Sequence, residues 1–253
     1  MIEAYTLFSG SSGNSLLVRS GSTAVLVDAG RSRRAVSLAL AQLEMSLADI
    51  AAVFVTHEHT DHISALTQIT KHEHLPVHAA AGTAEYLRAS VSGDCTVAHP
   101  PCYTEQVGDL TVTSFPLPHD SLCHVGYCFR DRDGDGFCAA TDMGHITDAV
   151  IGALDGCRGA LLESNHDPDM LRFGPYPASL KSRILAPTGH LSNEDCASLA
   201  VKAAMRGVRY IGLGHLSPEN NTPEKALTSA RKRLVGSGVE IVVCARDALT
   251  RIM

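Results

Sequence analysis

The segment His57–His62 (His-Glu-His-Thr-Asp-His) holds four side chains of metal-ligand type within six residues. The imidazoles at 57 and 59 are two positions apart, so they point to the same side of an extended chain. A carboxylate and a third imidazole follow, where a helix would begin. Four such ligands would crowd one ion, whereas two neighbouring ions have room for them, as in two-metal hydrolytic sites. The segment therefore predicts a dinuclear metal centre that catalyses hydrolysis.

Further ligands of the same kind are expected where strands end, because a strand end presents a side chain rigidly at one edge of a sheet. The apolar run Ile50–Thr56 leads into the histidine segment and is typical of a strand that is covered on both faces. His119, Asp142 and His215 each follow another strand-like run. We predict that these three residues complete the metal centre.

Strand-like and helix-like segments alternate along the whole chain. Short β-like runs open it, at Ala4–Phe8, Ser15–Arg19 and Ala24–Val27, and helix-like runs fill the last third, at 179–185, 192–205 and 223–234. Ser192 with Asp195, and Thr222 before Pro223, are typical helix starts. With no linker or repeat in view, the pattern predicts a single α/β domain over residues 1–253.

Composition indicates the class of protein and the cellular compartment in which it acts. Of the 253 residues, 45% are apolar, which is ample for a core, and the net charge of −6 argues against a generally basic surface. The eight cysteines form no Cys-x-x-Cys pair, so we expect reduced thiols in a cytoplasmic protein. We see no signal peptide. No apolar run approaches the roughly 20 residues that a membrane span needs.

Taken together, these motifs resemble the metallo-β-lactamase fold superfamily, whose His-x-His-x-Asp-His signature matches His57–His62. Val27–Gly30 (Val-Asp-Ala-Gly) also matches the family. Longer segments resemble the YycJ-like branch, which is related to RNase Z, RNase J and PhnP-type phosphodiesterases: Ser9–Ser15, Leu162–Asp167, Gly174–Pro177, Gly189–Asn193 and His215–Asn221. They span nearly the whole chain, and the space between Asp142 and His215 is too small for the inserted domain of RNase J.

The resemblance implies a four-layer αββα sandwich with two divalent metal ions, zinc or manganese, at the shared edge of its sheets. His57, His59 and His119 would hold one ion. The other would be held by Asp61, His62 and His215, with Asp142 as the bridge. Asp61 is also a catalytic candidate. The implied activity is that of a metal-dependent phosphodiesterase, an exonuclease that degrades DNA from a 5′ end by means of a metal-activated hydroxide.

Some roles at the site remain open. His190 is the candidate general acid, and its structural alternative is a residue that only caps the following helix. His124 competes with His119 as a ligand. The candidate substrate-binding residues, some of which have structural alternatives, are Ser11, Asn14, Glu163, His166, Arg172 and Tyr176.

Two groups of basic residues could contact phosphates, although a solvated charged loop explains each equally well. One group is Arg31, Arg33 and Arg34, which follow Val27–Gly30. The other group flanks the Gly-Pro-Tyr-Pro segment and consists of Arg172, Lys181 and Arg183.

Three other patterns are interpreted as structural. The spaced histidines at 72, 74 and 78 lack an adjacent Asp-His pair and lie where a helix ends, so we predict that they are on the surface. The run Asp131–Gly136 mimics the start of a calcium loop, but it lies between two β-like runs and predicts a hairpin turn. Cys123 beside His124 is interpreted as an idle thiol, since adjacency does not provide the geometry of a nucleophile pair.

Other functions remain as alternatives. One is hydrolysis of a small or cyclic phosphodiester, and another is thioester hydrolysis of the glyoxalase-II kind. A further hypothesis is that the protein is not an enzyme but a metal-binding regulatory module. A homodimer is compatible with the sequence, but nothing in the pattern requires one.

Overall fold

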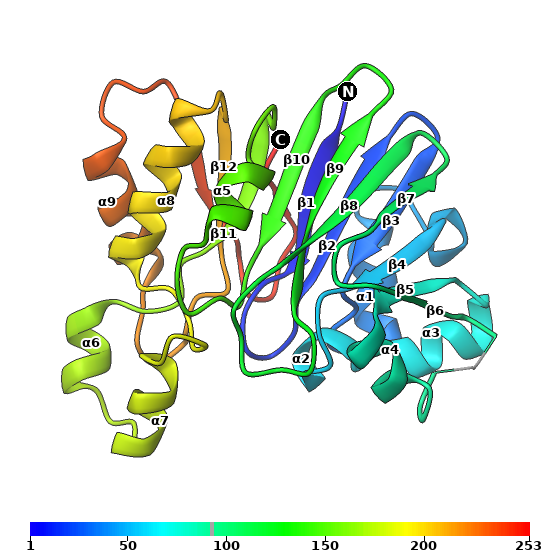
Figure 1. Cartoon of the computed structure of the whole chain (residues 1–253), viewed down its shortest axis with the longest axis horizontal. Coiled ribbons are helices and arrows are strands. Elements are labelled where there is room, and N and C mark those ends of the chain that lie inside the picture. The colour runs from blue at the N-terminus through cyan, green and yellow to red at the C-terminus, as the bar shows by residue number, and fades with distance from the viewer. Residues whose placement is uncertain (92–93) are drawn as a thin grey trace.

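Two β-sheets pack face to face and helices cover the outer face of each, which gives four layers in the order α/β/β/α (Figure 1). This computed structural model describes residues 1–91 and 94–253, and within them each sheet has seven strands. The predicted αββα sandwich is therefore confirmed.

The first sheet, sheet A, contains the N-terminal strands and one C-terminal strand, in the order β14-β1-β2-β3-β4-β5-β6. Strands β3 to β6 are parallel, and β1 pairs with β2 and β14 antiparallel. The strands are β1 (Glu3–Phe8), β2 (Ser15–Ser20), β3 (Thr23–Val27), β4 (Ala52–Val55), β5 (Val77–Ala80), β6 (Thr96–His99) and β14 (Thr250–Arg251).

The second sheet, sheet B, follows the order β13-β12-β11-β10-β9-β8-β7. Strands β10 to β13 are parallel, whereas β7 to β10 are joined antiparallel, so β8 runs in the same direction as β10, β11 and β12. The strands are β7 (Thr104–Val107), β8 (Leu110–Pro116), β9 (Val125–Asp131), β10 (Gly136–Ala140), β11 (Gly159–Glu163), β12 (Tyr210–Gly214) and β13 (Glu240–Val243).

Helices lie on both outer faces, and a few short ones lie at one end of the sandwich (Figure 1). Sheet A is covered by α1 (Arg33–Ala41), α3 (Leu66–Glu73) and α4 (Ala81–Leu87), with a 3-10 turn at Leu47–Asp49. Sheet B is covered by α5 (Asp148–Ala153), α8 (Asn193–Met205) and α9 (Pro223–Arg233). At the lower end in Figure 1 lie α2 (Thr60–Ile63), α6 (Pro168–Phe173) and α7 (Ala178–Ile184).

The two helix starts predicted from sequence are confirmed. The Ser192 hydroxyl accepts a hydrogen bond from the Asp195 backbone N–H at 3.1 Å, and Thr222 accepts one from Lys225 at 3.2 Å with Pro223 at the first helical position. These caps satisfy backbone donors that a helix leaves unpaired in its first turn. None of the helices within residues 1–91 and 94–253 combines the length and apolar character of a membrane-spanning segment.

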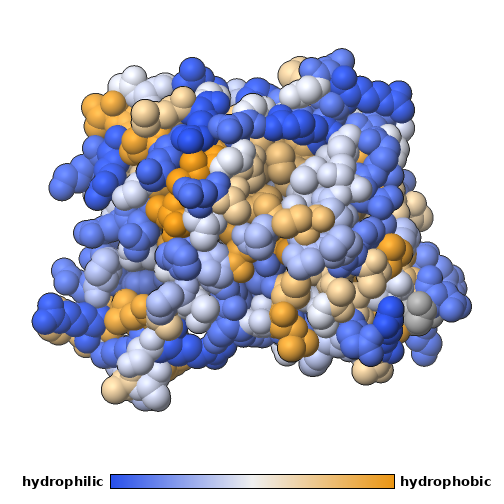
Figure 2. Space-filling model, in the orientation of Figure 1, coloured by the Kyte–Doolittle hydropathy of each residue, from blue (hydrophilic) through white to orange (hydrophobic). Residues whose placement is uncertain are grey.

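Three apolar clusters fill the spaces between the four layers. The cluster between the sheets includes Phe54, Tyr127 and Phe129, all fully buried. The Tyr127 hydroxyl donates a hydrogen bond to the Val55 carbonyl at 2.7 Å and so links β9 of one sheet to β4 of the other. Figure 2 shows a mainly hydrophilic outer face with separate apolar patches, in keeping with an interior that holds most large apolar side chains.

The histidine repeat at 72, 74 and 78 is only partly as predicted. His72 and His74 are exposed at the end of α3, but His78 lies in β5 and is 7% exposed, so the surface prediction is wrong for this residue. The error arises because β5 follows α3 after a short connection, and β5 turns every second side chain toward the space between the sheets. The hairpin turn predicted at Asp131–Gly136 is confirmed between β9 and β10.

Truncating Phe54 tests how strongly the layer between the sheets supports β4, the strand that leads into the histidine segment. Phe54→Ala should lower the free energy of unfolding by about 3–5 kcal/mol, because it leaves a cavity in a fully buried cluster. Leu38→Ala, at a 59% exposed position of α1, should change it by less than about 0.5 kcal/mol. Urea unfolding measures both, and equal losses in the two variants would contradict this view of the core.

Candidate metal centre

The histidine segment forms the turn between β4 and α2. His57 follows β4 and is fully buried, His59 is the residue before the first turn of α2, and Asp61 and His62 lie within that turn. The ring centroid of His57 lies 4.5 Å from that of His59 and 4.2 Å from that of His62. A strand that passes directly into a helix therefore gathers all four side chains at one point.

The other three predicted ligands reach the same point from sheet B. His119 follows β8, and its ring centroid lies 5.0 Å from that of His57. Asp142 follows β10, with one oxygen 3.5 Å from His62 Nε2. His215 follows β12, and its Nδ1 lies 3.2 Å from Asp142. Because β8, β10 and β12 run in the same direction, their carboxyl ends meet at one edge of the sandwich.

These seven residues form overlapping groups whose possible ligand atoms lie within 4.8 Å of one another: His57, His59 and His119; His57, His62 and Asp142; and Asp61, His62 and His215. The structure thus brings together every residue that the sequence suggested as a metal ligand. His124, the alternative to His119, belongs to none of the groups found among the described residues. Its Nε2 instead donates to the Thr141 carbonyl at 2.8 Å.

On the side of sheet A, the outer nitrogens of two imidazoles, those of His62 and His57, are already occupied. His62 Nδ1 hydrogen-bonds Asp28 at 2.7 Å, and His57 Nδ1 lies 3.0 Å from the Thr56 hydroxyl. Asp28 is itself fixed by the backbone N–H and the hydroxyl of Thr56, at 2.8 and 2.9 Å. Such outer partners fix the orientation of an imidazole and leave Nε2 to face the site.

The same arrangement holds on the side of sheet B. His119 Nδ1 lies 3.3 Å from the Gly189 carbonyl, and His215 Nδ1 lies 3.0 Å from Glu163. Glu163 is fully buried at the end of β11, and the same carboxylate oxygen also accepts from His190 Nδ1 at 2.7 Å. Its other oxygen accepts from the backbone N–H groups of Met143 and Leu191.

Four of the inward-facing ligand atoms have no hydrogen-bond partner among the described residues, whereas His62 Nε2 contacts the Asn14 amide at 3.0 Å. Among the described residues, Nε2 of His57, His119 and His215 and Oδ2 of Asp142 are buried and have no hydrogen-bond partner. Buried polar atoms without a partner are rare in folded proteins and need an explanation. Three imidazole nitrogens and a carboxylate oxygen that converge without partners are the donor set that Zn²⁺ or Mn²⁺ binds, so the residues fit a metal centre.

Two buried carboxylates at the site are held in their ionised form by the imidazoles around them. Burial alone would raise the pKa of the Asp142 carboxyl, but the imidazoles of His215 and His62 hold it well below its usual range. Burial likewise opposes ionisation of Glu163, yet His190 and His215 lower its pKa to about 2. Burial keeps the pKa of His57 well below that of free histidine, so this ring is neutral, as a metal ligand must be.

Two of the converging residues have unusual backbone conformations. Asp142 has φ of +60° and His215 has φ of +56°, in the left-handed region that non-glycine residues seldom occupy. Each such conformation costs of order 1–3 kcal/mol and persists only where the surroundings impose it. His215 directly follows β12 and Asp142 comes two residues after β10, so the strain lies where the chain leaves a strand of sheet B and turns a side chain into the site.

A cavity of about 200 Å³ opens over these groups. Helix α7 forms one wall of it through Leu180, Arg183 and Ile184, and His190 lies on the same wall as Gly189. The Arg183 guanidinium is held by Asp120, with Nε 2.5 Å from the carboxylate, and its side chain remains 59% exposed. The mouth of the site is therefore lined by an arginine beside the buried ligands.

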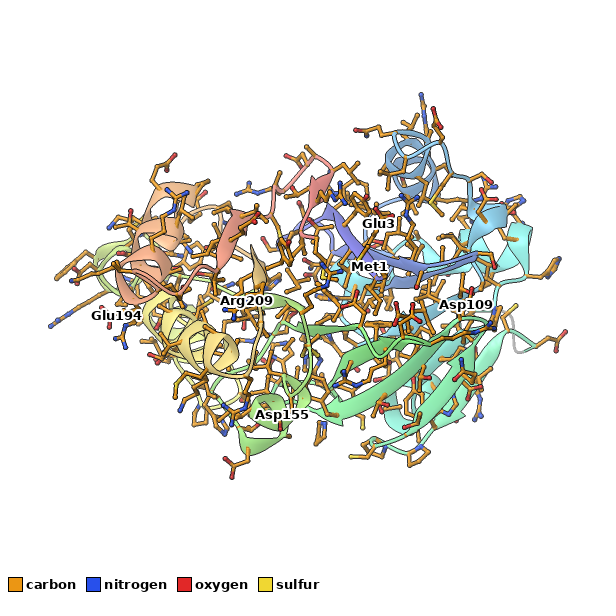
Figure 3. All side chains as sticks on the ribbon, turned by 90° about the horizontal axis from the view of Figure 1, so that it is seen from above. Met1, Glu3, Asp109, Asp155, Glu194 and Arg209 are labelled. Carbon is orange, nitrogen blue, oxygen red and sulfur yellow. The ribbon has the colours of Figure 1, made fainter. Side chains whose placement is uncertain are left out.

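A larger cavity of about 790 Å³ lies at the opposite end of the sandwich and is lined by Met1 and Glu3. Figure 3 views the molecule from this end and labels both residues. The arginines of this cavity are already paired: Arg19 with Glu3 at 2.6 Å, and Arg158 with Asp135 at 2.7 Å. Arg251, the third arginine of its lining, also pairs with Glu3, and none of the metal-ligand groups found among the described residues lies there, so size alone does not make it the functional site. The smaller cavity, where buried ligand atoms lack hydrogen-bond partners among the described residues, is therefore the candidate functional site.

The predicted substrate-binding residues divide into those at the cavity and those away from it. Ser11 lines the cavity, and the Asn14 amide contacts Asp61 at 3.1 Å and His62 at 3.0 Å. Glu163 and His166 are buried at 0% and 2% exposure, and the Glu163 oxygens are used by its neighbours, so both lie behind the site rather than in contact with a substrate.

The remaining basic and aromatic candidates do not line the cavity. Arg172 is exposed and lies against the Phe173 ring, and Tyr176 is partly buried between α6 and α7. Arg31 pairs with Asp247, and Arg33 pairs with Glu73. Two members of the first basic group are thus engaged in ion pairs and Arg34 is exposed, whereas Arg183 of the second group lies at the site.

The sequence analysis assigns no role to Asp28 and Thr56, which orient His62 and His57. It leaves Glu163 open between a substrate contact and a structural residue, and the structure favours the second. The signal for Asp28 was present in Val27–Gly30, at the end of β3 beside β4. An acidic residue at the end of a strand parallel to the one that leads into the ligands is well placed to support them. Glu163, at the end of β11 between β10 and β12, carries the same signal.

The fold and the site together define a metallo-hydrolase of the metallo-β-lactamase type. The family model for the Beta-lactamase superfamily domain matches residues 23–213, and the chain belongs to this family. The predicted family is therefore confirmed.

Individual relatives extend the likeness over nearly the whole chain. The chain is 36% identical over 235 residues to exodeoxyribonuclease YycJ of Bacillus anthracis, covering 92% of this chain and 89% of that one. It is 34% identical over 246 residues to exodeoxyribonuclease WalJ of Streptococcus pneumoniae, covering 94% and 91%. The crystal structure of the metallo-beta-lactamase fold protein YhfI from Bacillus subtilis superposes with a TM-score of 0.75 at 17% identity over 99% of both chains.

The role of Glu163 behind the ligands can be tested directly. Glu163→Gln should weaken zinc binding about 10- to 100-fold, because the neutral amide no longer holds His215 by a charged hydrogen bond. Competition with a chromogenic chelator measures the affinity. Glu224→Gln, at an exposed position of α9, is the matched control and should bind zinc like the wild type. Wild-type affinity in Glu163→Gln would show that this carboxylate does not support the site.

Proposed function

We propose that the protein is a metal-dependent exodeoxyribonuclease that hydrolyses DNA phosphodiester bonds. The observation that carries the proposal is the set of bare, buried nitrogen and oxygen atoms that converge at the ends of β4, β8, β10 and β12. The chain's similarity along nearly its full length to relatives named exodeoxyribonuclease supports the choice of substrate.

The residues fit two divalent ions, zinc or manganese. His57, His59 and His119 hold one, Asp61, His62 and His215 hold the other, and Asp142 lies between the two sets. When bound, such a pair of ions supplies a hydroxide nucleophile near neutral pH and neutralises charge on the phosphoryl oxygens.

His190 is the proton donor in this proposal. Its Nδ1 donates to the buried Glu163 carboxylate at 2.7 Å, which fixes the ring while the side chain lines the cavity. A leaving oxygen needs a proton, and an imidazole oriented by a carboxylate is suited to give one. The capping role considered for His190 does not account for the Glu163 contact, because helix α8 is capped by Ser192.

Substrate contact is assigned to the residues at the mouth of the cavity. Arg183 offers the exposed part of its guanidinium to a phosphate, and Ser11 and Asn14 lie on the side of the N-terminal loop. A local arginine beside the metal centre permits DNA binding in a chain whose net charge is −6, because the field at a site depends on the distribution of charge. Arg172 and Tyr176 remain predicted contacts for a longer strand that passes along α6 and α7.

The wider setting follows from the same proposal. In this proposal, residues 1–253 form a single domain that contains all residues of the metal centre and of the substrate-binding site. All eight cysteines are free thiols, which suits a reducing compartment such as the cytoplasm, where the DNA substrate lies. Homodimer formation remains a prediction.

A parallel substrate panel tests the reaction. The manganese- or zinc-loaded protein should shorten a 5′-phosphorylated DNA duplex or single strand from its 5′ end, because the site is built for phosphodiester hydrolysis. The same assay offers an RNA of equal sequence, a 2′,3′-cyclic nucleotide and a lactoyl thioester. Rapid turnover of the cyclic nucleotide or the thioester with intact DNA would rule out the nuclease.

Asp142→Ala is the inactive reference for this panel. It should lose both cleavage and bound metal, since Asp142 is 2% exposed at the centre of the ligand groups. Asp133→Ala, in the exposed β9–β10 turn, is the matched control and should keep both. Full activity and full metal content in Asp142→Ala would remove this residue from the centre.

His190→Ala separates proton transfer from metal binding. Turnover of DNA should fall by about 10²- to 10⁴-fold, the usual contribution of a general acid, while the metal content stays at the wild-type level. An activated DNA end with a leaving group that needs no proton should recover most of the rate. His72→Ala, at an exposed position of α3, should behave as wild type. An unchanged rate in His190→Ala would end its assignment as the acid.

A further inference from the structure

A second group of metal-ligand side chains lies away from the candidate metal centre, at the lateral edge where both sheets end. His78 comes from β5, His99 ends β6, and Glu105 lies on β7. Each offers one ligand atom, and the three atoms lie within 4.8 Å of one another. Among the residues that the structure describes, no other such group is free of residues from the metal centre.

The two imidazoles are held in place by flanking rings. His78 stacks on Phe54, with centroids 4.8 Å apart, and His99 stacks on Tyr103, with centroids 3.8 Å apart and ring planes 6° apart. Between them, a hydrogen bond of 2.9 Å joins His78 Nδ1 and His99 Nε2, and a bound ion would take the place of the hydrogen that the two rings share. Tyr103 is fixed in turn by the Tyr127 hydroxyl at 3.4 Å. The two nitrogens are therefore positioned side by side before any ligand arrives.

The third member of the group, Glu105, can offer a carboxylate oxygen to an ion bound by these two nitrogens. Its side chain is half-buried, and within residues 1–91 and 94–253 it forms no ion pair with a basic side chain. Ligand atoms around a tetrahedral zinc ion, with bonds of about 2.0–2.1 Å, lie roughly 3.3 Å apart. The two imidazole nitrogens are already about this close. The Glu105 carboxylate lies within 4.8 Å of both, so a small approach of this side chain would complete the set.

The position of the group suggests what an ion there would do. Strands β6 and β7 are the last strands of different sheets and do not pair with each other. In the described residues, the chain between them passes through Pro100 and Pro101, which offer no backbone N–H for a ladder. A bond that joins β5, β6 and β7 would hold the two sheets together at an edge where no strand pairing does so.

We propose that His78, His99 and Glu105 bind one zinc ion, separate from the dinuclear centre, with water as the fourth ligand. Two imidazoles and one carboxylate form a ligand set that zinc accepts with an open fourth position. At this edge the ion ties sheet A to sheet B and stabilises the folded chain, since a ligand that binds only the folded state favours it.

The test counts zinc ions and compares thermal stability. The full chain is stripped with a chelator, reloaded with zinc, separated from free metal, and assayed for zinc per chain by mass spectrometry of the element. His99→Ala and Glu105→Gln should each carry one zinc ion fewer than wild type and lose part of the zinc-induced rise in Tm. Both should cleave DNA at the wild-type rate, because neither lies at the metal centre.

The controls keep this site distinct from the dinuclear centre and from adventitious binding. His74→Ala, an exposed histidine at the end of α3, should keep the wild-type zinc count and Tm. Asp142→Ala should lose metal from the dinuclear centre while still responding to His99→Ala with the loss of one further ion. Equal zinc content and equal Tm shifts in wild type, His99→Ala and Glu105→Gln would overturn the proposal. A loss in His74→Ala as large as that in His99→Ala would overturn it as well.

Discussion

The structure depends on keeping a buried carboxylate, Asp142, surrounded by imidazole nitrogens. Asp142 is 2% exposed, and one of its oxygens has no hydrogen-bond partner among the described residues. An isolated carboxylate in an apolar interior is strongly unfavourable, and it persists only with compensating positive charge. His62 and His215 approach it to 3.5 and 3.2 Å, which is the arrangement that a bound cation completes.

This constraint extends outward through both sheets. On one side, Asp28 and Thr56 hold His62 and His57, which makes the ends of β3 and β4 part of the site. On the other side, Glu163 at the end of β11 holds both His190 and His215. The sandwich brings these two halves together through the layer between the sheets, so the alignment of β4 with β8, β10 and β12 determines the geometry of the metal centre.

The sequence predicts much of this arrangement because most of the metal ligands lie in short segments that can be recognised from their own neighbours in the chain. The strand before His57 and the ligand pattern are contained in a dozen residues, and His119, Asp142 and His215 each mark a strand end. The strands β6 and β7 escape prediction because they are edge strands with mostly exposed side chains and no apolar run. The role of Glu163 stays open in the sequence, since its partners His190 and His215 are 27 and 52 residues away. The parallel pairing of β11 and β12 brings His215 to it, and the loop before α8 brings His190.

Anomalous X-ray diffraction from crystals of the manganese- or zinc-loaded protein tests the central claim most directly. We expect two metal peaks at the end of the sandwich, one bound by His57, His59 and His119 and the other by Asp61, His62 and His215, with Asp142 in contact with both. The group Asp142, Glu163, His190 and His215 also lies within 4.8 Å, so the experiment has a definite alternative. A single peak at this end, or a peak bound by Glu163 and His190, would contradict the dinuclear centre.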